Sequence, residues 1–553
     1  MAVWKCVAVS LLLARSHAGE NSSPSPIRCS QVVVGGGPGG VYAAFRLAEA
    51  ARTESKGAPP VCLFERSDRL GGRILSLRGM GPKQDLVVEA GAYRFSPKVD
   101  CAKWGPKGHE ITECEYTPLT AAIVKGALDL PTGLYDPDSQ HNSSMEKIVD
   151  SQGHSAGYST FVEEMAQQMV STGHAKIFFE HELLALREAE DGTKDVLLQL
   201  KSPDGLKVAR TQSVVLNLPQ LPLLRMLGAS SSAFSPPPPL FAPMTHAIMK
   251  FYVYYEDAWW RNYLNLTAGV FDNAASTEGI GQEYFWGVQF PAPLVGRYFD
   301  GDYRCDGEAP RKCRGYLEVA YTGDNAAVEF FRPYVLNRQL PVHILNASHP
   351  VSGELLKIVH RSLVELHKDA LRSAGKLELV NASLPDSGVL SLWSAEAVGY
   401  ESGCHFMKSP LAAGTAPGDV PLFRNSSAER GRLLLQPFGA STQIFVANEA
   451  FGWPSCWAES SLVMAENAVL RMANLSRPRW LSEAVYKHIL FEKSASEVPA
   501  QVPADTGIVV SGHDPFLIRT KLKSYADSSA EGARSAAFPK GKFSKQAGFE
   551  TVV

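Results

Sequence analysis

The feature that most constrains the fold is a glycine-rich run at residues 32–40, which reads Val-Val-Val-Gly-Gly-Gly-Pro-Gly-Gly. The apolar residues at its start are typical of a buried strand, and the alanine-rich residues 41–50 predict a helix. Between them, Gly35, Gly37 and Gly40 have the G-x-G-x-x-G spacing of a dinucleotide-binding turn. The first glycine permits a tight turn, the second lets the backbone approach a pyrophosphate, and the third lets helix and strand pack closely. The helix N-terminus supplies partial positive charge to the phosphates.

A second apolar segment, residues 61–64, ends at Glu65, an acid placed to bind ribose hydroxyls. Its neighbour Arg66 is included in the predicted cofactor site. The sequence then continues as Arg69-Leu70-Gly71-Gly72-Arg73. Gly71 and Gly72 form a second glycine pair able to approach the pyrophosphate, and Arg73 could neutralise it. Nicotinamide-dependent dehydrogenases usually lack this second motif.

The double motif resembles the flavin amine oxidase superfamily, which includes monoamine, polyamine and L-amino-acid oxidases and in which FAD is the cofactor. The resemblance covers roughly residues 30–475 and implies an α/β fold. A Rossmann-like FAD-binding domain is expected from the discontinuous segments 30–100, 161–244 and 394–475. An α+β substrate domain is expected from residues 101–160 and 245–393.

The resemblance extends to residues 444–449 and 457–461, which are similar to the segments that close the FAD site in this superfamily. It implies that Glu449 binds ribityl or phosphate-side hydroxyls and that Glu459 caps the helix that contacts the flavin. Trp457 would then form a wall of the substrate cavity. Asn448 departs from the glycine that is usual at its position.

Lys250 interrupts an apolar strand predicted at residues 246–254. Protection of a sheet edge would explain a lysine there without any catalytic role. In the family, however, the lysine at this strand position holds a water against the flavin N5 atom, and this resemblance makes Lys250 the candidate catalytic residue.

Arg94 and Tyr321 are the candidate residues for binding a substrate carboxylate. Residues 89–94 match the segment that follows the second glycine motif in the superfamily, and L-amino-acid oxidases have an arginine at its final place. A guanidinium suits a carboxylate because two parallel hydrogen bonds fix both orientation and charge. Residues 315–321 resemble the strand on which those oxidases place a tyrosine that bonds the same carboxylate. Together the two residues favour an amino acid over a plain amine.

Cys404 stands within about one residue of the place where monoamine oxidases attach FAD through a cysteine. L-amino-acid oxidases generally bind FAD without a covalent bond, so a covalent link at Cys404 stays open, and a free or disulfide-bonded cysteine is the favoured outcome. Two disulfides are plausible from local spacing, Cys101 with Cys114 and Cys305 with Cys313. Cys62 lies in an apolar strand and is expected to be an inert buried thiol.

The composition excludes several classes of partner and places the chain in a compartment. The net charge is −3 and basic residues do not cluster with aromatic ones, so nucleic-acid binding is not expected. The sequence has no ligand pattern for a metal and no apolar stretch of about 18 residues that would span a membrane. Residues 1–18 resemble a secretory signal peptide, and residues 495–553 predict a polar, disordered tail.

Secretion is also favoured by seven N-x-Ser/Thr sequons: Asn21, Asn142, Asn265, Asn346, Asn381, Asn425 and Asn474. The chain is therefore expected to be a glycoprotein that is secreted or resides in the lumen of the secretory pathway. Its oligomeric state cannot be inferred from the sequence.

The function that the resemblance implies is oxidative deamination of an L-amino acid by FAD and O₂, which yields a 2-oxo acid, ammonia and H₂O₂. A polyamine or primary-amine oxidase is one alternative, in which Arg94 would be structural. A secreted flavoprotein without turnover is the other.

Overall fold

The computed structural model describes residues 25–52, 58–96, 117–135, 145–270, 297–307, 312–323, 325–335, 337–406, 431, 433–452, 454 and 456–491. The predicted signal peptide, the predicted tail and the predicted Cys101–Cys114 disulfide lie outside these residues.

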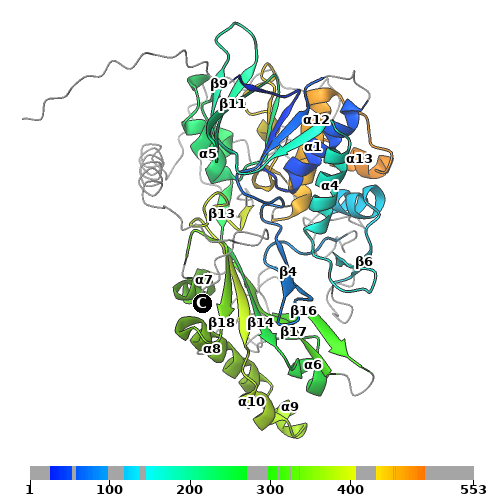
Figure 1. Cartoon of the computed structure of the whole chain (residues 1–553), viewed down its shortest axis with the longest axis vertical. Helices are drawn as coiled ribbons and strands as arrows, with labels where there is room; N and C mark the ends of the chain where they lie inside the picture. Colours follow the sequence, from blue (N-terminus) through cyan, green and yellow to red (C-terminus); the bar gives the residue numbers. More distant parts are fainter. Residues whose placement is uncertain are drawn as a thin grey trace, which may run out of the picture.

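A five-stranded parallel sheet forms the upper half of the molecule in Figure 1. Its strand order is β21 (Ile444–Val446), β12 (Val214–Leu216), β2 (Val32–Val34), β3 (Val61–Phe64) and β8 (Ala175–Phe178). Strands β2, β3, β12 and β21 are buried throughout, which explains why they read as continuous apolar runs without alternation. Segments far apart in the sequence therefore meet side by side in one sheet.

Three helices pack with this sheet: α1 (Pro38–Ala51), α4 (Thr160–Ser171) and α12 (Ala458–Ala473). A buried ion pair joins the first of them to the last, since Arg46 Nε lies 3.0 Å from Glu466 Oε2. Tyr42 donates its hydroxyl to the same carboxylate oxygen at 2.8 Å. Because both charges are buried, losing either partner would leave the other uncompensated. This pair fixes α12 against α1.

Further small elements surround the parallel sheet. A four-stranded sheet has the order β1 (Ile27–Arg28), β11 (Gly205–Thr211), β10 (Val196–Ser202) and β9 (Glu182–Glu188). Two-stranded sheets pair β4 (Ser76–Met80) with β5 (Leu86–Glu89), β6 (Thr132–Leu134) with β7 (Glu146–Ile148), and β13 (Met244–His246) with β20 (Cys404–Phe406). The helical pieces are α3 (Pro118–Ala121), a π-helix (Ala122–Ala127), α5 (Gln220–Gly228) and α13 (Glu483–Ile489).

A six-stranded sheet forms the lower half of the molecule (Figure 1). Its order is β15 (Ala268–Val270), β16 (Arg297–Asp306), β17 (Lys312–Thr322), β14 (Ile248–Tyr255), β19 (Ser387–Trp393) and β18 (Val342–Asn346). The helices of this half are α6 (Trp259–Leu264), α7 (Asn325–Phe331), α8 (Pro350–Leu366), α9 (Lys368–Ser373) and α10 (Leu377–Ala382). Strand β14 is central and pairs antiparallel with β17 and β19, which excludes the edge-strand explanation for Lys250.

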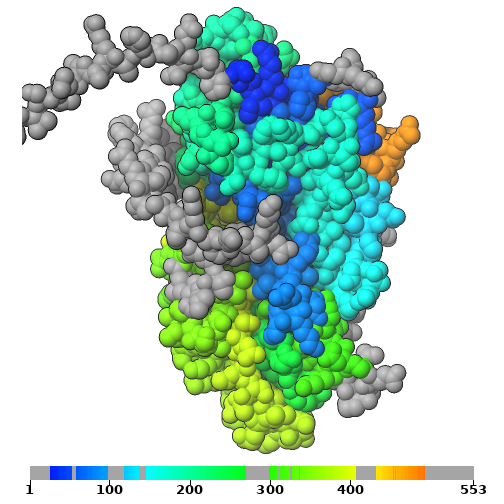
Figure 2. Space-filling model, in the orientation of Figure 1, coloured from blue at the N-terminus to red at the C-terminus, as the bar shows by residue number. Residues whose placement is uncertain are grey.

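Each half has its own apolar core, and a smaller cluster lies where β4 and β5 meet β14, β17 and β19. The space-filling view shows the same division, with blue and cyan segments intermixed on the upper half and green segments covering the lower end (Figure 2). The predicted fold class, a Rossmann-like α/β domain built from discontinuous segments with an α+β partner, is confirmed.

The described disulfides correct one prediction and confirm another. Cys62 is not a free thiol, because it is bonded to Cys29, which directly follows β1. This pairing could not be predicted from local spacing, because Cys29 stands 33 positions before Cys62. The predicted pair Cys305–Cys313 is present, and its two residues face each other across β16 and β17.

Candidate active site

The glycine turn is held in a shape that only small residues allow. Gly35 has a φ of +97°, and a Cβ there would lie 2.4 Å from the backbone oxygen of Asn217. At Gly40 a Cβ would lie 1.9 Å from the oxygen of Gly35, so helix α1 could not pack this closely onto β2 with any other residue. Gly72, with a φ of +58°, brings the second glycine motif against Gly37, since its Cβ would lie 3.3 Å from the Gly37 Cα atom. The two motifs are thus one continuous backbone surface.

Glu65 follows β3 and is held by backbone donors. Its carboxylate accepts hydrogen bonds from the N–H of Gly36 at 2.6 Å and from the N–H and hydroxyl of Ser67 at 2.7 Å each. The side chain is therefore fixed at the end of the strand, in the position the sequence predicts for a ribose-binding acid. Beside it, Arg66 donates to the Val398 carbonyl at 2.8 Å and lies over the ring of Tyr400.

A cavity of about 410 Å³ begins at this backbone surface. Gly35, Gly37, Glu65, Arg66 and Gly72 line its nucleotide end. The lining continues to a second end made of Lys250, Tyr321, Trp393, Cys404 and Trp457. The structure thus brings together most of the predicted cofactor and substrate residues around one space.

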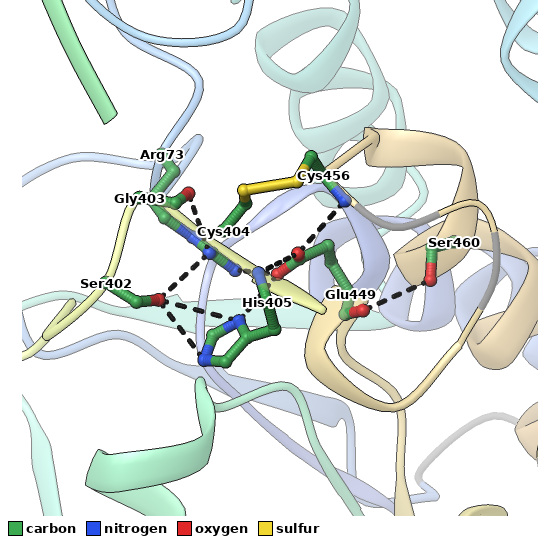
Figure 3. Close-up of a disulfide and its surroundings, with 8 residues drawn as sticks. All are labelled: Arg73, Ser402, Gly403, Cys404, His405, Glu449, Cys456 and Ser460. Atoms are coloured by element: carbon green, nitrogen blue, oxygen red, sulfur yellow. Dashed lines mark hydrogen bonds and ion pairs between the residues drawn. A yellow bond between two sulfur atoms is a disulfide. The ribbon is translucent and has the colours of Figure 1, made fainter. Parts of the chain in front are cut away.

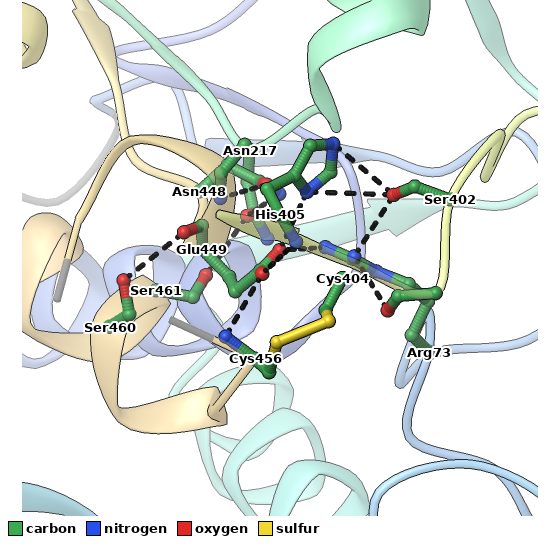
Figure 4. A network of polar contacts seen from close by, with 12 residues as sticks. Arg73, Asn217, Ser402, Cys404, His405, Asn448, Glu449, Cys456, Ser460 and Ser461 are labelled. Atoms are coloured by element: carbon green, nitrogen blue, oxygen red, sulfur yellow. Dashed lines mark hydrogen bonds and ion pairs between the residues drawn. A yellow bond between two sulfur atoms is a disulfide. The ribbon is translucent and has the colours of Figure 1, made fainter. Parts of the chain in front are cut away.

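Glu449 is the centre of a polar network in the wall of this cavity (Figure 4). Arg73 donates to its Oε2 atom at 2.7 Å, and the backbone N–H groups of His405 and Cys456 donate to Oε1 at 2.8 and 3.1 Å. Burial alone would raise the pKa of Glu449, but Arg73 and His405 outweigh it and hold that pKa at about 2. Glu449 therefore stays ionised and joins three segments.

Asn217 connects this network to the glycine turn. It donates to the Gly35 oxygen at 3.3 Å and accepts from Asn448 Nδ2 and Ser461 Oγ at 3.1 Å each (Figure 4). Asn448, which departs from the superfamily pattern, thus has a structural partner here, and its own side-chain oxygen accepts from the Ala450 N–H at 3.1 Å. The asparagine at position 448 is thus accommodated by its hydrogen bond to Asn217.

Cys404 is bonded to Cys456, as Figure 3 shows. A cysteine in a disulfide has no thiol that could form a thioether to the flavin. The structure therefore has the disulfide-bonded form of Cys404 and not the form that could attach FAD covalently. The partner stands 52 positions later, next to Trp457, and no sequence pattern pointed to it.

Lys250 projects from β14 into a buried and largely aromatic site. Its ammonium donates to the backbone oxygens of Gly91 and Glu89, at 2.6 and 3.3 Å, and lies 3.3 Å from the centre of the Tyr93 ring. Burial disfavours the charged form and lowers the pKa of Lys250 to about 7, although the carboxylates of Glu318 and Glu89 act in the opposite direction. A buried lysine that can lose its proton near neutral pH is suited to bind or polarise a water.

Arg94 and Tyr321 lie near Lys250 but differ in access to the cavity. Tyr321 is 39% exposed and lines it. Arg94 is not among the lining residues, and its guanidinium instead lies over the rings of Tyr93 and Tyr135, at 4.9 and 5.3 Å from their centres. The described residues include no salt-bridge partner for Arg94. Its charge is thus stabilised by aromatic rings.

Glu459 has a different role from the one predicted. Helix α12 has Trp457 at its N-cap, and Glu459 in its first turn reaches across to α3, where it accepts from the N–H groups of Leu119 and Thr120 at 2.8 and 2.7 Å. The carboxylate therefore satisfies the free donors at the start of α3, and Glu459 does not line the cavity. Trp457 does line it, as the resemblance implies.

Several site residues were missed by sequence reasoning. They are Glu89, Asn217, Glu318, Trp393, His405 and Cys456. Glu318 is the most informative, because it is buried, accepts from the Tyr135 hydroxyl at 3.3 Å and has one carboxylate oxygen without a partner among the described residues. A charged residue inside the apolar run 315–321 was a visible signal, since such residues are seldom buried without a partner.

The comparisons with known proteins support the nucleotide end of the site. A family model described as an NAD(P)-binding Rossmann-like domain matches residues 33–100. A search of the curated proteins found no match to this chain. The matched residues contain both glycine motifs and Glu65. The chain thus carries a Rossmann-like dinucleotide-binding domain, of the kind used by oxidoreductases that include FAD-dependent enzymes.

The residues present fit a dinucleotide. Side chains at Gly35, Gly40 or Gly72 would meet backbone atoms within 3.5 Å, so glycine is required for this turn. Gly35, Gly37 and Gly72 line the cavity, where their backbone can face a pyrophosphate. Arg73 and the start of α1 supply positive charge beside it. Glu65 can accept the ribose hydroxyls that the fingerprint requires.

Proposed function

We propose that this chain is an FAD-dependent oxidase that oxidatively deaminates an L-amino acid. One observation carries the proposal: a single cavity has the dinucleotide-binding backbone at one end and Lys250, Tyr321 and Trp457 at the other. FAD, when bound, supplies the two-electron acceptor for the substrate and returns the electrons to O₂. The overall reaction converts an amino acid, O₂ and water into a 2-oxo acid, ammonia and H₂O₂.

The residues of this chain would divide the remaining work. Gly37, Gly72 and Arg73 would hold the pyrophosphate, and Glu65 a ribose. The second glycine pair favours FAD over a nicotinamide cofactor, because it places another stretch of open backbone against the first.

At the other end, the low pKa of Lys250 lets the amine be neutral at physiological pH, so that it can hold a water or accept a proton. Trp393 donates its indole N–H to the Ala90 carbonyl at 2.7 Å, which fixes the ring in the cavity wall. Together with Trp457 it would exclude bulk water from the reacting atoms.

A substrate carboxylate would be bound by the Tyr321 hydroxyl and Arg94. The charge of Glu318 acts on the guanidinium of Arg94, but the two do not form a salt bridge among the described residues. This supports a role for Arg94 in binding an external carboxylate. It would have to turn from the rings of Tyr93 and Tyr135 to do so.

The position of Arg94 also favours a second candidate, a polyamine or primary-amine oxidase. In that enzyme the ring-stacked Arg94 would be structural, and the aromatic wall would contact an uncharged or cationic amine. A flavoprotein without turnover is the third possibility.

H₂O₂ release from matched pairs of substrates tests these proposals. Each L-amino acid would be assayed beside the amine that results from its decarboxylation, together with spermine and spermidine. Release from amino acids alone supports the proposed function, whereas release from amines supports the second candidate. If FAD-loaded protein releases H₂O₂ from neither amino acids nor amines, both proposed oxidase activities are contradicted.

We also propose that the protein acts in an oxidising compartment of the secretory pathway. The disulfides support this, and so does the exposure of every sequon asparagine that the structure describes: Asn265, Asn346, Asn381 and Asn474. The helices of the described residues do not include one long and apolar enough to cross a membrane. Removal of N-glycans from protein made in a eukaryotic host should lower its apparent mass.

A further inference from the structure

The Cys404–Cys456 disulfide differs from the other described disulfides in its location. Cys404 begins β20, and Cys456 lies just before helix α12. Both cysteines line the cavity, together with Arg73, Lys250 and Trp457. Both residues of the disulfide are therefore part of the wall that a molecule in this cavity would face.

The other two described disulfides do not have this access. Cys29–Cys62 is buried beside the parallel sheet, and Cys305–Cys313 joins neighbouring strands of the six-stranded sheet. Neither pair lines the cavity. Stabilisation of the fold explains these two, but it does not explain why a third is placed in the wall of a cofactor cavity.

The segments that carry Cys404 and Cys456 are also held together without the S–S bond (Figure 3). One oxygen of Glu449 accepts from the backbone N–H of Cys456 and from that of His405, the residue after Cys404. Arg73 bonds the other Glu449 oxygen and also donates to the Gly403 carbonyl, at 3.0 Å. Strand β20 is in addition paired with β13. Opening of the disulfide would thus leave two thiols close together and able to close again.

We propose that Cys404 and Cys456 form a redox-active pair that accepts two electrons from the reduced cofactor in this cavity. The inference rests on the proposed FAD site. In the step, the S–S bond breaks and each sulfur gains one electron and one proton, while reduced FAD loses two electrons and two protons and becomes oxidised. One reduced FAD and one disulfide thus become one oxidised FAD and two thiols, and the reaction is reversible.

The expected consequence is a capacity of four electrons per FAD where a simple flavoprotein has two. Holoprotein would be titrated with dithionite without oxygen, and the flavin absorbance followed. Bleaching should be complete only after four electrons per FAD. Alkylation of the reduced protein followed by mass spectrometry should label Cys404 and Cys456 and leave the other two described disulfides intact. Complete bleaching at two electrons, with Cys404 and Cys456 unlabelled, would overturn the inference.

Two double variants sharpen the test. Cys404→Ser with Cys456→Ser should bleach at two electrons per FAD, while Cys305→Ser with Cys313→Ser removes a disulfide outside the cavity and should still need four. If the first variant fails to fold, the titration and labelling of the unmodified protein still decide. Protein without FAD overturns the proposed cofactor, whereas FAD-loaded protein that bleaches at two electrons overturns only the role of the disulfide.

Discussion

The two ends of the cavity are built in different ways. At the nucleotide end, the two glycine motifs and the acid stand close together in the sequence: Gly36 and Glu65, which are hydrogen-bonded, are 29 positions apart. At the substrate end, Lys250 bonds the backbone oxygen of Gly91 across 159 positions. The nucleotide end uses backbone shape and one carboxylate, whereas the substrate end uses buried side chains whose charges depend on one another. A cofactor site of the first kind can be recognised from a short motif, and a substrate site of the second kind requires the fold.

The largest expected effect is at the nucleotide end. In Gly40→Ala the new Cβ would lie 1.9 Å from the Gly35 oxygen, so α1 must move away from the turn. We expect loss of bound cofactor and a destabilisation of about 3 kcal/mol, because the obstacle is backbone that cannot rotate aside. Cofactor content and thermal unfolding measure the two effects. Gly228→Ala is the matched control, since a Cβ there meets nothing within 4 Å. Equal losses of cofactor and stability in both variants would contradict the role of Gly40 in the glycine turn.

At the substrate end, Lys250→Met should leave the cofactor bound and slow the chemistry. Loss of a group that moves or positions a proton commonly costs about 100-fold in rate. Stopped-flow traces of flavin reduction and reoxidation would measure this loss, with Lys201→Met as the control because Lys201 is an exposed residue of β10. Unchanged traces in both half-reactions would remove Lys250 from the active site.

Arg94→Ala tests whether the substrate is an amino acid. If Arg94 binds a carboxylate, the variant loses a charge-assisted contact of about 1.5–3 kcal/mol, which raises KM for amino acids roughly 10- to 100-fold. KM for the matching amines should not change. Arg94→Lys keeps the charge without the planar fork and should recover only part of the loss. Equal changes for amino acids and amines would identify Arg94 as structural.

The smallest expected effect is a shift in pH dependence. Burial lowers the pKa of Lys250 to about 7, so the active neutral amine forms as pH rises and the rate should increase through this range. Glu318 favours the protonated lysine, so Glu318→Gln should make the proton easier to lose and move the rising limb to lower pH, by about one unit. A limb that stays in place would show that Glu318 does not act on Lys250.

The contrast between the two ends also explains what the sequence could predict. Gly35, Glu65 and Gly72 were predictable because the chemistry depends on glycine conformation and spacing, which a sequence displays directly. The bonds of Glu459 to the start of α3 could not be predicted. Its partners are more than 300 positions away and become neighbours only through the fold. The same holds for the disulfide of Cys404. A cysteine carries no sequence signal for which of several distant cysteines it will face.

Glu318 is a different case, since its signal was present. It stands in the apolar run of β17, and such a carboxylate needs a nearby cation or donor. Arg94 and Lys250 supply the positive charge from other elements, and burial raises the pKa of Glu318 against them. Pattern alone could indicate a buried acid but not its partners.

The cofactor content of the purified full-length protein tests the central claim most directly. Absorbance in the flavin region and chromatography of the material released by acid should identify one FAD per chain. After acid precipitation all of the FAD should appear in the supernatant and none in the protein pellet. The sulfur of Cys404 is bonded to Cys456 and so is not linked to the flavin. A colourless protein that cannot be reconstituted with FAD would contradict the account.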